Sequence, residues 1–350
     1  MTARGTTLDT GNRFLRGSSL PFDDGWESFG PDPDPGTQFL DDSSRTAFAT
    51  NNSPDIPFTH SINPYRGCSH GCSYCYARPT HEYLGFNAGL DFETKIMVKR
   101  DVAALARQAM MKKSWKPTVV SMSGVTDPYQ PAERKFRLTR GVMEVMIEFR
   151  NPVVVVTKNA LVARDVDLLS ELAKHRCAAV LLSITTLDRN LARRLEPQTS
   201  TPELRLQAIR KLTDAGVPTG VMIAPVIPGL NDEEIPAILK LAADAGATVA
   251  GRTLLRLPLA VAPIFLDWLD REEPARALKV RHALEEMRDG KLNLTEFGAR
   301  MRGTGARAEV IAQLFKTHAA RYGFNRHTFP LTTANFRRPA AGGQMELFGE

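Results

Sequence analysis

Cysteine, aromatic residues and long apolar runs are all scarce in this sequence of 350 residues. Four cysteines are too few for the disulfide scaffold of a small secreted protein. No apolar run approaches the roughly 18 residues of a membrane-spanning helix, and no apolar stretch follows Arg4 as it would in a secretory signal. We therefore expect a cytoplasmic protein. The hydrophobic content of 43% supports a sizeable core, which excludes a mostly disordered chain.

A large charge of either sign is also missing, because 45 Lys and Arg stand against 39 Asp and Glu, a net charge of +6. The charge is unevenly spread. Residues 1–57 hold four basic residues, nine acidic residues and six prolines, which predicts an irregular acidic N-terminal arm over residues 1–54. Residues 291–338 hold nine basic and two acidic residues. Their arginines, interleaved with aromatics and glycines, suit nucleic-acid contact and equally a solvated helix face.

Between these two regions, short apolar runs alternate with helical patterns, which predicts an α/β fold with a parallel sheet, open or closed into a barrel. The expected strands are Val119–Ser123, Val153–Thr157, Ala179–Ser183, Gly220–Ala224 and Thr248–Leu255. The expected helices are residues 101–113, Leu138–Phe149, Asp165–His175, Pro202–Ala215, Asp232–Ala245, Ile264–Leu269 and Pro274–Met287. We expect a core barrel over residues 55–265, a helical basic region over 266–338 and a flexible tail over 339–350.

Three of the four cysteines lie within eight residues, as Cys68, Cys72 and Cys75 in the spacing C-x3-C-x2-C. Three thiolates on one short glycine-containing loop can converge on a soft-metal centre. For zinc, a fourth ligand would come from His70, His60 or His81. For a [4Fe–4S] cluster, the fourth iron would stay open to a ligand. The remaining alternative is three unrelated buried thiols.

This motif, with aromatic Tyr74 before the last cysteine, resembles the signature of the radical S-adenosylmethionine (SAM) superfamily. The resemblance implies a partial (β/α)6 TIM-type barrel, with Pro57–Tyr65 as its first strand, an irregular N-terminal arm and a helical C-terminal extension. It implies that the three cysteines hold a [4Fe–4S] cluster and that SAM chelates the open iron. Reductive cleavage of SAM would give a 5′-deoxyadenosyl radical that abstracts hydrogen from a substrate. An electron donor such as flavodoxin or ferredoxin would supply the electron.

Within that superfamily, the sequence looks like the spore photoproduct lyase-related subgroup. The matching stretches are Ile62–Arg66 before the cysteines, Tyr76 directly after them, and Thr126–Pro131 after the second barrel strand. The resemblance makes Tyr76 a catalytic candidate. It makes polar or aromatic residues at the loop and strand ends candidates for SAM binding, because strand ends face the active site of a barrel. These are Tyr74, Ser123, Thr126, Asp127, Lys158 and Ser183.

One departure from the subgroup concerns its radical-relay cysteine on the second barrel strand. No cysteine lies between Cys75 and Cys177, and the position falls on Ser121 or Gly124. An O–H bond is a far worse hydrogen-atom donor than an S–H bond. Lyase activity on spore photoproduct is therefore not expected, whereas a radical step on another substrate is. Cys177 is expected to be a small buried residue.

The segment Gln344–Phe348 in the C-terminal tail resembles the peptide by which bacterial repair and replication proteins bind the DNA sliding clamp. Together, these features predict a radical SAM enzyme that acts on nucleic acid and is recruited by the clamp. A radical SAM enzyme for a peptide or small molecule, and a non-catalytic zinc-stabilised module that binds nucleic acid or the clamp, are the alternatives.

Overall fold

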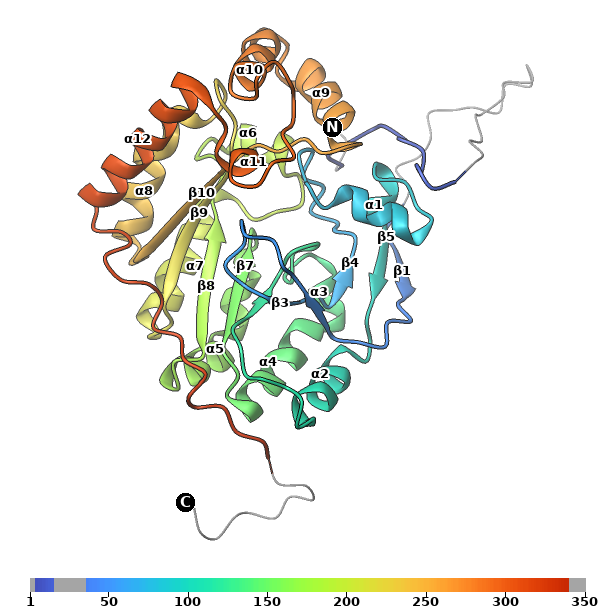
Figure 1. Cartoon of the computed structure of the whole chain (residues 1–350), viewed down its shortest axis with the longest axis vertical. Coiled ribbons are helices and arrows are strands. Elements are labelled where there is room, and N and C mark those ends of the chain that lie inside the picture. The colour runs from blue at the N-terminus through green and yellow to red at the C-terminus, as the bar shows by residue number, and fades with distance from the viewer. Residues whose placement is uncertain (1–3, 16–35, 340–350) are drawn as a thin grey trace.

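A seven-stranded sheet forms the centre of the computed structural model, which describes residues 4–15 and 36–339 (Figure 1). The strand order is β10-β9-β8-β7-β6-β3-β2, and all neighbours run parallel except the antiparallel pair β2 and β3. The strands are β2 (Phe48–Thr50), β3 (His60–Ile62), β6 (Val120–Met122), β7 (Val153–Thr157), β8 (Ala178–Ser183), β9 (Thr219–Val226) and β10 (Val249–Leu254). Within the described chain no pairing joins β10 to β2, so the curved sheet is a partial barrel and does not close.

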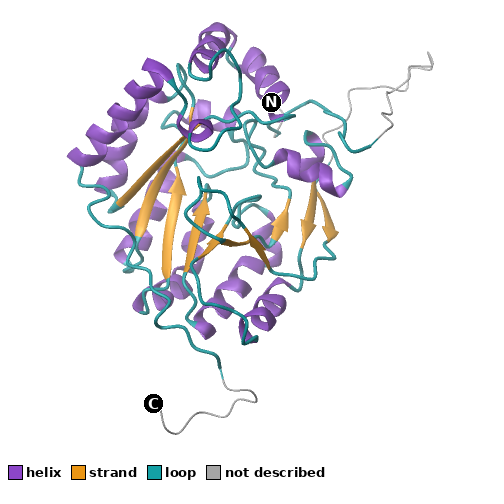
Figure 2. Ribbon diagram, viewed as in Figure 1, coloured by secondary structure: helices purple, strands orange, loops and turns teal. Residues whose placement is uncertain are grey.

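Helices cover the outer face of this sheet, while loops gather at the carboxyl ends of the strands (Figure 2). The covering helices are α2 (Val102–Met111), α4 (Leu138–Phe149), α5 (Val166–Lys174), α7 (Pro202–Asp214) and α8 (Ile235–Asp244). Their apolar stripes meet the β-branched residues of the strands in one continuous core that includes Met143, Met146, Val155 and Ile223. The predicted alternation of strand and helix, and the α/β class, are confirmed.

The expected elements match the observed ones within a few residues, and Leu138–Phe149 has the same bounds as α4. Asp101 stands at the N-terminus of α2, although its side chain makes no capping hydrogen bond there. The expected helix from Asp232 begins as a short 3₁₀ turn, η3 (Asp232–Glu234), before α8 starts at Ile235. Pro236 lies in the first turn of α8, where a backbone N–H would have no acceptor within the helix, so its absence costs nothing.

The N-terminal arm is less irregular than we predicted from its prolines and acidic residues. Its described part supplies β2 at the edge of the large sheet and β1 (Gln38–Asp41) in a second sheet of order β1-β5-β4. The partners of β1 are β5 (Lys95–Val98) and β4 (Tyr65–Arg66), with α1 (Leu90–Thr94) preceding β5. Pairing with an available sheet edge satisfies backbone groups, and local composition does not reveal such an edge.

The C-terminal region is helical, as predicted, and packs over the mouth of the barrel. It contains α9 (Val261–Glu272), α10 (Pro274–Glu286), α11 (Ala299–Arg302) and α12 (Gly305–Arg321). Trp268 and Phe265 of α9 belong to an apolar cluster that also includes Cys72 and Tyr74. The indole Nε1 of Trp268 donates to the carbonyl of Arg194 on α6 (Arg189–Leu195), at 2.9 Å. The C-terminal helices therefore form one wall around the cysteine loop.

Contacts other than strand pairing link the two edges of the open sheet. Helix α11 packs against β10. The start of α11 also contacts the loop between β2 and β3. There, Asp55 accepts hydrogen bonds from Gly298 N at 2.6 Å and from Arg300 Nε at 2.5 Å. Within the described parts of the chain, no helix has the length and apolarity needed to cross a membrane.

Candidate functional site

The three-cysteine loop occupies the stretch between β4 and the 3₁₀-helix η1 (Arg78–Leu84). No disulfide involves its thiols; Cys68 and Cys72 are buried and Cys75 is half-buried. Gly71 has a φ of +67°, and a Cβ at this position would lie 2.9 Å from a carboxylate oxygen of Glu93. The path of the loop therefore requires glycine between the first two cysteines, for both its backbone angle and its space.

A buried arginine immediately after the loop holds its backbone in place. Arg78 is fully buried, and its guanidinium donates to the carbonyl of Cys72 from Nε at 3.1 Å and from Nη2 at 2.9 Å. Nη1 reaches the carbonyls of Ala88 at 3.2 Å and Gly89 at 3.0 Å. Glu93, also fully buried, forms the ion pair that neutralises this cation. The planar fork of arginine suits this set of acceptors in a way that lysine does not.

The stretch Thr126–Pro131 contacts the cysteine loop from the other side. The buried Gln130 donates to the carbonyl of Gly67 at 3.1 Å and accepts from the backbone N–H of Ser69 at 3.0 Å. The hydroxyl of Thr126 donates to the same Gly67 carbonyl at 2.7 Å and accepts from Gln130 at 2.9 Å. These residues flank Cys68, so this segment positions the loop at the carboxyl end of β6.

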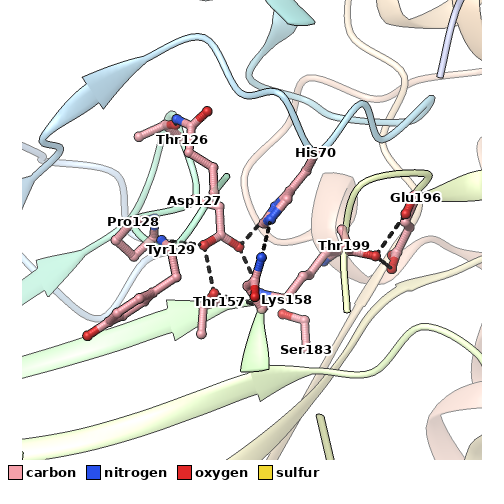
Figure 3. A network of polar contacts seen from close by, with 12 residues as sticks. His70, Thr126, Asp127, Pro128, Tyr129, Thr157, Lys158, Ser183, Glu196 and Thr199 are labelled. Carbon is pink, nitrogen blue, oxygen red and sulfur yellow. Dashed lines mark hydrogen bonds and ion pairs between the residues drawn. The ribbon is translucent and has the colours of Figure 1, made fainter. Parts of the chain in front are cut away.

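Asp127 joins the ends of two neighbouring strands to the cysteine loop (Figure 3). Its carboxylate accepts from the Thr157 hydroxyl at 2.6 Å and from the Lys158 backbone N–H at 2.8 Å, both at the end of β7. It lies 3.4 Å from Nδ1 of His70, which is in the loop. Nε2 of His70 is 3.0 Å from the side-chain amide nitrogen of Asn159.

The electrostatics of this contact favour a proton on Nδ1 of His70, facing an ionised Asp127. Burial alone would lower the pKa of His70, but the Asp127 carboxylate and the Cys68 thiol raise it to about 10. Burial would raise the pKa of Asp127, yet His70 and the hydroxyl and N–H donors at the end of β7 hold it below its usual range. Both ring nitrogens of His70 are occupied, which leaves none free as a fourth metal ligand.

Tyr74 points into the barrel wall and its ring is buried. Its hydroxyl donates to the buried carboxylate of Glu196, which also accepts from the Thr185 hydroxyl at 2.5 Å and pairs with Arg205. Although burial would raise it, the pKa of Glu196 is lowered to about 2 by Arg205, by Lys158 and by these hydroxyl donors. The hydroxyl of Tyr74 therefore has a structural partner, and the ring face remains the part that can contact a ligand.

Three of the predicted SAM-binding residues lie at strand ends with side chains that are not fully used by the protein. Lys158, after β7, donates from Nζ to the carbonyl of Ala224 at 3.0 Å, and this Nζ stands 5.7 Å from the centre of the Tyr74 ring. Two of its three N–H groups stay available. Ser123, after β6, makes one hydrogen bond, to the Thr126 carbonyl at 3.3 Å, and Ser183 ends β8 beside the network of Figure 3.

Tyr76 is the most exposed of the predicted site residues, with 53% of its surface accessible. Its hydroxyl donates to the carbonyl of Gly124, after β6, at 2.6 Å. The guanidinium of Arg256, after β10, stands 5.9 Å from its ring centre. Tyr76 therefore lies at the mouth, between the ends of two strands that are far apart in the sheet order.

The donor set fits an iron–sulfur cluster. Burial raises the pKa of the Cys72 thiol, and it raises that of Cys75 to about 11, so metal binding is what would favour their thiolate forms. Among residues 4–15 and 36–339, no three His, Cys, Asp or Glu side chains are arranged to hold a single metal ion. His60 bonds to Thr59 Oγ1 through Nδ1, and His81 packs against Phe86 and Phe92. Three cysteine thiols on one loop are soft ligands of the kind that hold iron–sulfur clusters.

A three-cysteine loop at the carboxyl end of a partial β/α barrel defines a class of enzyme that holds a metal cluster at the barrel mouth. Comparison with known proteins gives the family, since the pattern of the radical SAM superfamily matches residues 62–242, about half of the chain. The chain belongs to the radical SAM superfamily and is a radical SAM enzyme. Enzymes of this family use a [4Fe–4S] cluster and SAM. This assignment leaves the non-catalytic zinc module without support.

The sequence relatives include an uncharacterized protein of Mycobacterium tuberculosis and its counterpart in Mycobacterium bovis. Each is 39% identical over 232 residues, which cover 66% of this chain and 68% of the relative. A radical SAM Nα-GlyT isomerase of Pseudomonas phage M6 is 25% identical over 168 residues, which cover 48% of this chain and 33% of that protein.

Solved structures of spore photoproduct lyase share the fold. The lyase in complex with dinucleoside spore photoproduct superimposes with a TM-score of 0.58 at 19% identity, covering 82% of this chain and 80% of the lyase. A mutant of that enzyme with bound SAM and the same dinucleoside superimposes with a TM-score of 0.56 at 20% identity. The resemblance to the lyase that the motifs indicated therefore extends to the whole barrel.

Several residues that organise the site were not singled out in the sequence. Arg78, Glu93, Gln130, Glu196 and Arg205 are buried polar or charged side chains that hold the loop or its neighbours. Gln130 lies within the stretch Thr126–Pro131 that matches the subgroup, and this match was the sequence signal that could have marked it as a site residue. The others look like ordinary charged residues on a helix or turn, because only the folded chain shows which charges are buried.

Proposed function

We propose that Cys68, Cys72 and Cys75 hold a [4Fe–4S] cluster at which this enzyme cleaves SAM reductively to initiate a radical reaction on a nucleic-acid substrate. The observation that carries the proposal is the set of three free thiols on a loop held at the barrel mouth by Arg78 and Gln130. When bound, the cluster and SAM supply a 5′-deoxyadenosyl radical that abstracts hydrogen from a substrate.

The chain contributes position and the exclusion of water. Arg78 and Gln130 fix the backbone on both sides of the cysteines, so the three sulfur atoms keep their relative places before the cluster binds. Trp268 and the apolar residues packed with Cys72 and Tyr74 keep solvent from the loop. A dry, preorganised site limits side reactions of a radical and directs it toward one substrate atom.

We assign the contacts to SAM from the hydrogen-bonding groups that each predicted side chain does not use within the protein. Lys158 would bind the methionyl carboxylate, and Ser123 and Ser183 would bind hydroxyl groups of the ribose. Thr126 and Asp127 bind protein groups through their side chains, so they act on SAM by placing the cysteine loop and Lys158. The ring face of Tyr74 would lie beside the adenine.

Nucleic acid is the substrate class that we favour for this site. Support comes from the basic C-terminal region beside the mouth and from the fold shared with an enzyme that binds a dinucleoside lesion. Tyr76, exposed at the mouth, would contact substrate and return a hydrogen atom. Because the relay cysteine is missing, the reaction proposed is not the repair of spore photoproduct. A peptide or small-molecule substrate is the alternative.

The cluster is tested by anaerobic purification, iron and sulfide analysis and absorbance near ~400 nm, where Fe–S clusters absorb. Cys68→Ala, Cys72→Ala and Cys75→Ala should each lose iron and the formation of 5′-deoxyadenosine. Cys177→Ala is the matched control, since Cys177 is buried and its thiol contacts the Arg150 carbonyl at 3.1 Å, away from the loop. Equal iron content in the triple variant and wild type would contradict the assignment.

The substrate class is tested by deuterium transfer. Reduced enzyme with SAM is mixed with deuterated single-stranded DNA, RNA or peptide, and deuterium in 5′-deoxyadenosine is measured by mass spectrometry. Transfer from DNA or RNA supports the proposal, and transfer from peptide alone refutes it. Flavodoxin and ferredoxin should replace a chemical reductant in this assay, which would identify the class of electron donor.

The clamp-binding motif Gln344–Phe348 lies outside the described residues, so its support is the sequence alone. We propose that it recruits this enzyme to the DNA sliding clamp in the cytoplasm, from a tail (339–350) that follows the barrel (55–265) and the helical basic region (266–338). A clamp pull-down should retain wild type and lose the Leu347→Ala/Phe348→Ala variant. Failure with wild type would refute this part.

A further inference from the structure

Two arginines at the end of β10 have hydrogen-bond donors that the protein does not use. Arg288, in the turn after α10, is fully buried, and one of its groups donates to the carbonyl of Leu255. Its Nε and Nη1 are buried without any hydrogen-bond partner. Arg256 lies two residues after the end of β10, and its Nε is likewise buried without a partner. Buried donors that lack an acceptor are rare in proteins and call for a ligand or water.

Among the described residues, no ion pair involves Arg256 or Arg288. The other two buried arginines of this part of the chain, Arg78 and Arg205, are each paired with a glutamate. The carboxylate that comes near Arg256 is Asp55, and it is bound by Arg300 and Gly298 N. Burial and the nearby charge of Arg256 lower the pKa of Arg288 to about 10, as expected for two cations that share a site without an anion.

Arg256 lies at the mouth of the barrel, and the fully buried Arg288 donates to the carbonyl of the preceding residue, Leu255. Arg256 stands 5.9 Å from the centre of the exposed Tyr76 ring and contacts the sulfur of Met301 on α11 at 3.7 Å. Arg252 and Arg302 extend the positive charge along the same edge, because each lies near the other and neither is ion-paired within the described chain. An anion bound here would therefore sit beside the aromatic ring that follows the last cysteine.

We propose that Arg256 and Arg288 form a binding site for a phosphodiester of the nucleic-acid substrate, with the adjacent base placed against Tyr76. This inference rests on the proposed function, since it names how that substrate is held. A phosphate accepts from two guanidinium groups in the bidentate manner that arginine favours. Bases stack on exposed aromatic rings beside such phosphate contacts.

The carboxylate of SAM is the other anion at this mouth, and the geometry assigns it elsewhere. Nζ of Lys158 stands 5.7 Å from the ring centre of Tyr74 within the cysteine loop and bonds to the Ala224 carbonyl at 3.0 Å. The Arg256 guanidinium stands 5.9 Å from the ring centre of Tyr76, the residue after the last cysteine. Lys158, beside the Tyr74 ring, thus serves SAM, and the arginine pair beside Tyr76 serves the substrate.

The test is binding of a fluorescein-labelled 12-nucleotide thymidine strand, measured by fluorescence anisotropy on the anaerobically purified enzyme without reductant, from 50 to 200 mM NaCl. Arg256→Gln and Arg288→Gln should each weaken binding about tenfold, the effect of losing one charged hydrogen bond. The slope of log affinity against log salt should fall by about 0.7 for each phosphate that the variant no longer neutralises. Arg256→Lys should keep that slope.

Arg107→Gln is the matched control, because it removes the same charge from an exposed ion pair with Glu148 on the helical face of the barrel. It should bind like wild type. The binding result for Arg288→Gln counts only if the circular dichroism spectrum of this variant matches that of wild type. If it does not, the Arg256→Gln variant, whose side chain is half-exposed, decides the test. A strand of the same sequence with neutral methylphosphonate links should lose the difference between wild type and variants.

Three results would overturn the inference. These are equal binding by Arg256→Gln and wild type, equal binding of the charged and neutral strands, and displacement of the strand by saturating SAM. Formation of 5′-deoxyadenosine by reduced wild type is measured separately. If wild type forms 5′-deoxyadenosine while the variants bind the strand normally, the phosphate site is wrong and the proposed chemistry stands. If wild type forms none while Arg256→Gln loses binding, the phosphate site stands and the proposed chemistry is wrong.

Discussion

Replacing Arg78 by methionine tests whether one buried ion pair supports the metal site. The guanidinium makes hydrogen bonds to the carbonyls of Cys72, Ala88 and Gly89 and pairs with Glu93, and both charged residues are fully buried. Methionine is of similar length and apolar, so it fills the space but leaves the buried Glu93 carboxylate without Arg78, with the Gly5 N–H still donating to it at 3.0 Å. We expect the variant to lose both stability and iron.

The magnitude follows from the cost of an unpaired buried charge. Breaking a buried pair by removing one partner costs about 3–5 kcal/mol, a large share of the roughly 5–15 kcal/mol that holds a typical domain folded. With a denaturant slope of about 3 kcal/mol per molar urea, the midpoint should fall by about 1 M or more. Iron content should fall as well, because the carbonyl of Cys72 loses two of its donors.

The double variant Arg78→Met/Glu93→Leu separates an unpaired charge from a general weakening of the packing. Removing both charges should recover most of the urea midpoint, since an apolar pair often replaces a buried ion pair at little cost. Arg100→Met is the control for an exposed pair, with Asp41, and should change stability by less than about 0.5 kcal/mol. A midpoint loss in Arg78→Met no larger than in Arg100→Met, or a double variant less stable than the single, would refute the reasoning.

Three other substitutions test the loop and its neighbours. Gln130→Leu should lower iron per chain, because three hydrogen bonds to Gly67 and Ser69 of the cysteine loop disappear. Gln313→Leu on exposed α12 should not lower it, and equal iron in both variants would contradict the role of Gln130. Gly71→Ala should lose more iron and stability than Gly85→Ala, since both have positive φ but only Gly71 meets a close neighbour. Glu196 has a lowered pKa, so its stabilisation is present above about pH 4.5 and disappears as the pH falls toward 2. Glu196→Gln should therefore flatten the loss of thermal stability over that range, and an unchanged profile would argue against it.

Much of the barrel was predictable because its strands are buried on both faces. Such strands read as continuous β-branched runs, as in Val153–Thr157, and the helices between them carry one apolar stripe. The short strands β1 and β2 were not predicted, because they are formed by pairing at sheet edges and their sequences carry no alternation. An edge becomes available only when the remaining chain has folded.

By itself, the sequence determined the class of protein and indicated the three cysteines that we propose as the ligands of its cluster. The spacing of Cys68, Cys72 and Cys75 is a local feature, since three thiols on one short stretch of chain can converge on one soft-metal centre. Tertiary structure decided how the site is supported and what stands near it. The pairing of Arg78 with Glu93, and the approach of Arg256 from β10 to Tyr76, join residues that are distant in the sequence or unremarkable within it. The role of such a charged residue depends on whether it is buried and whether it has a partner, and both are properties of the folded chain.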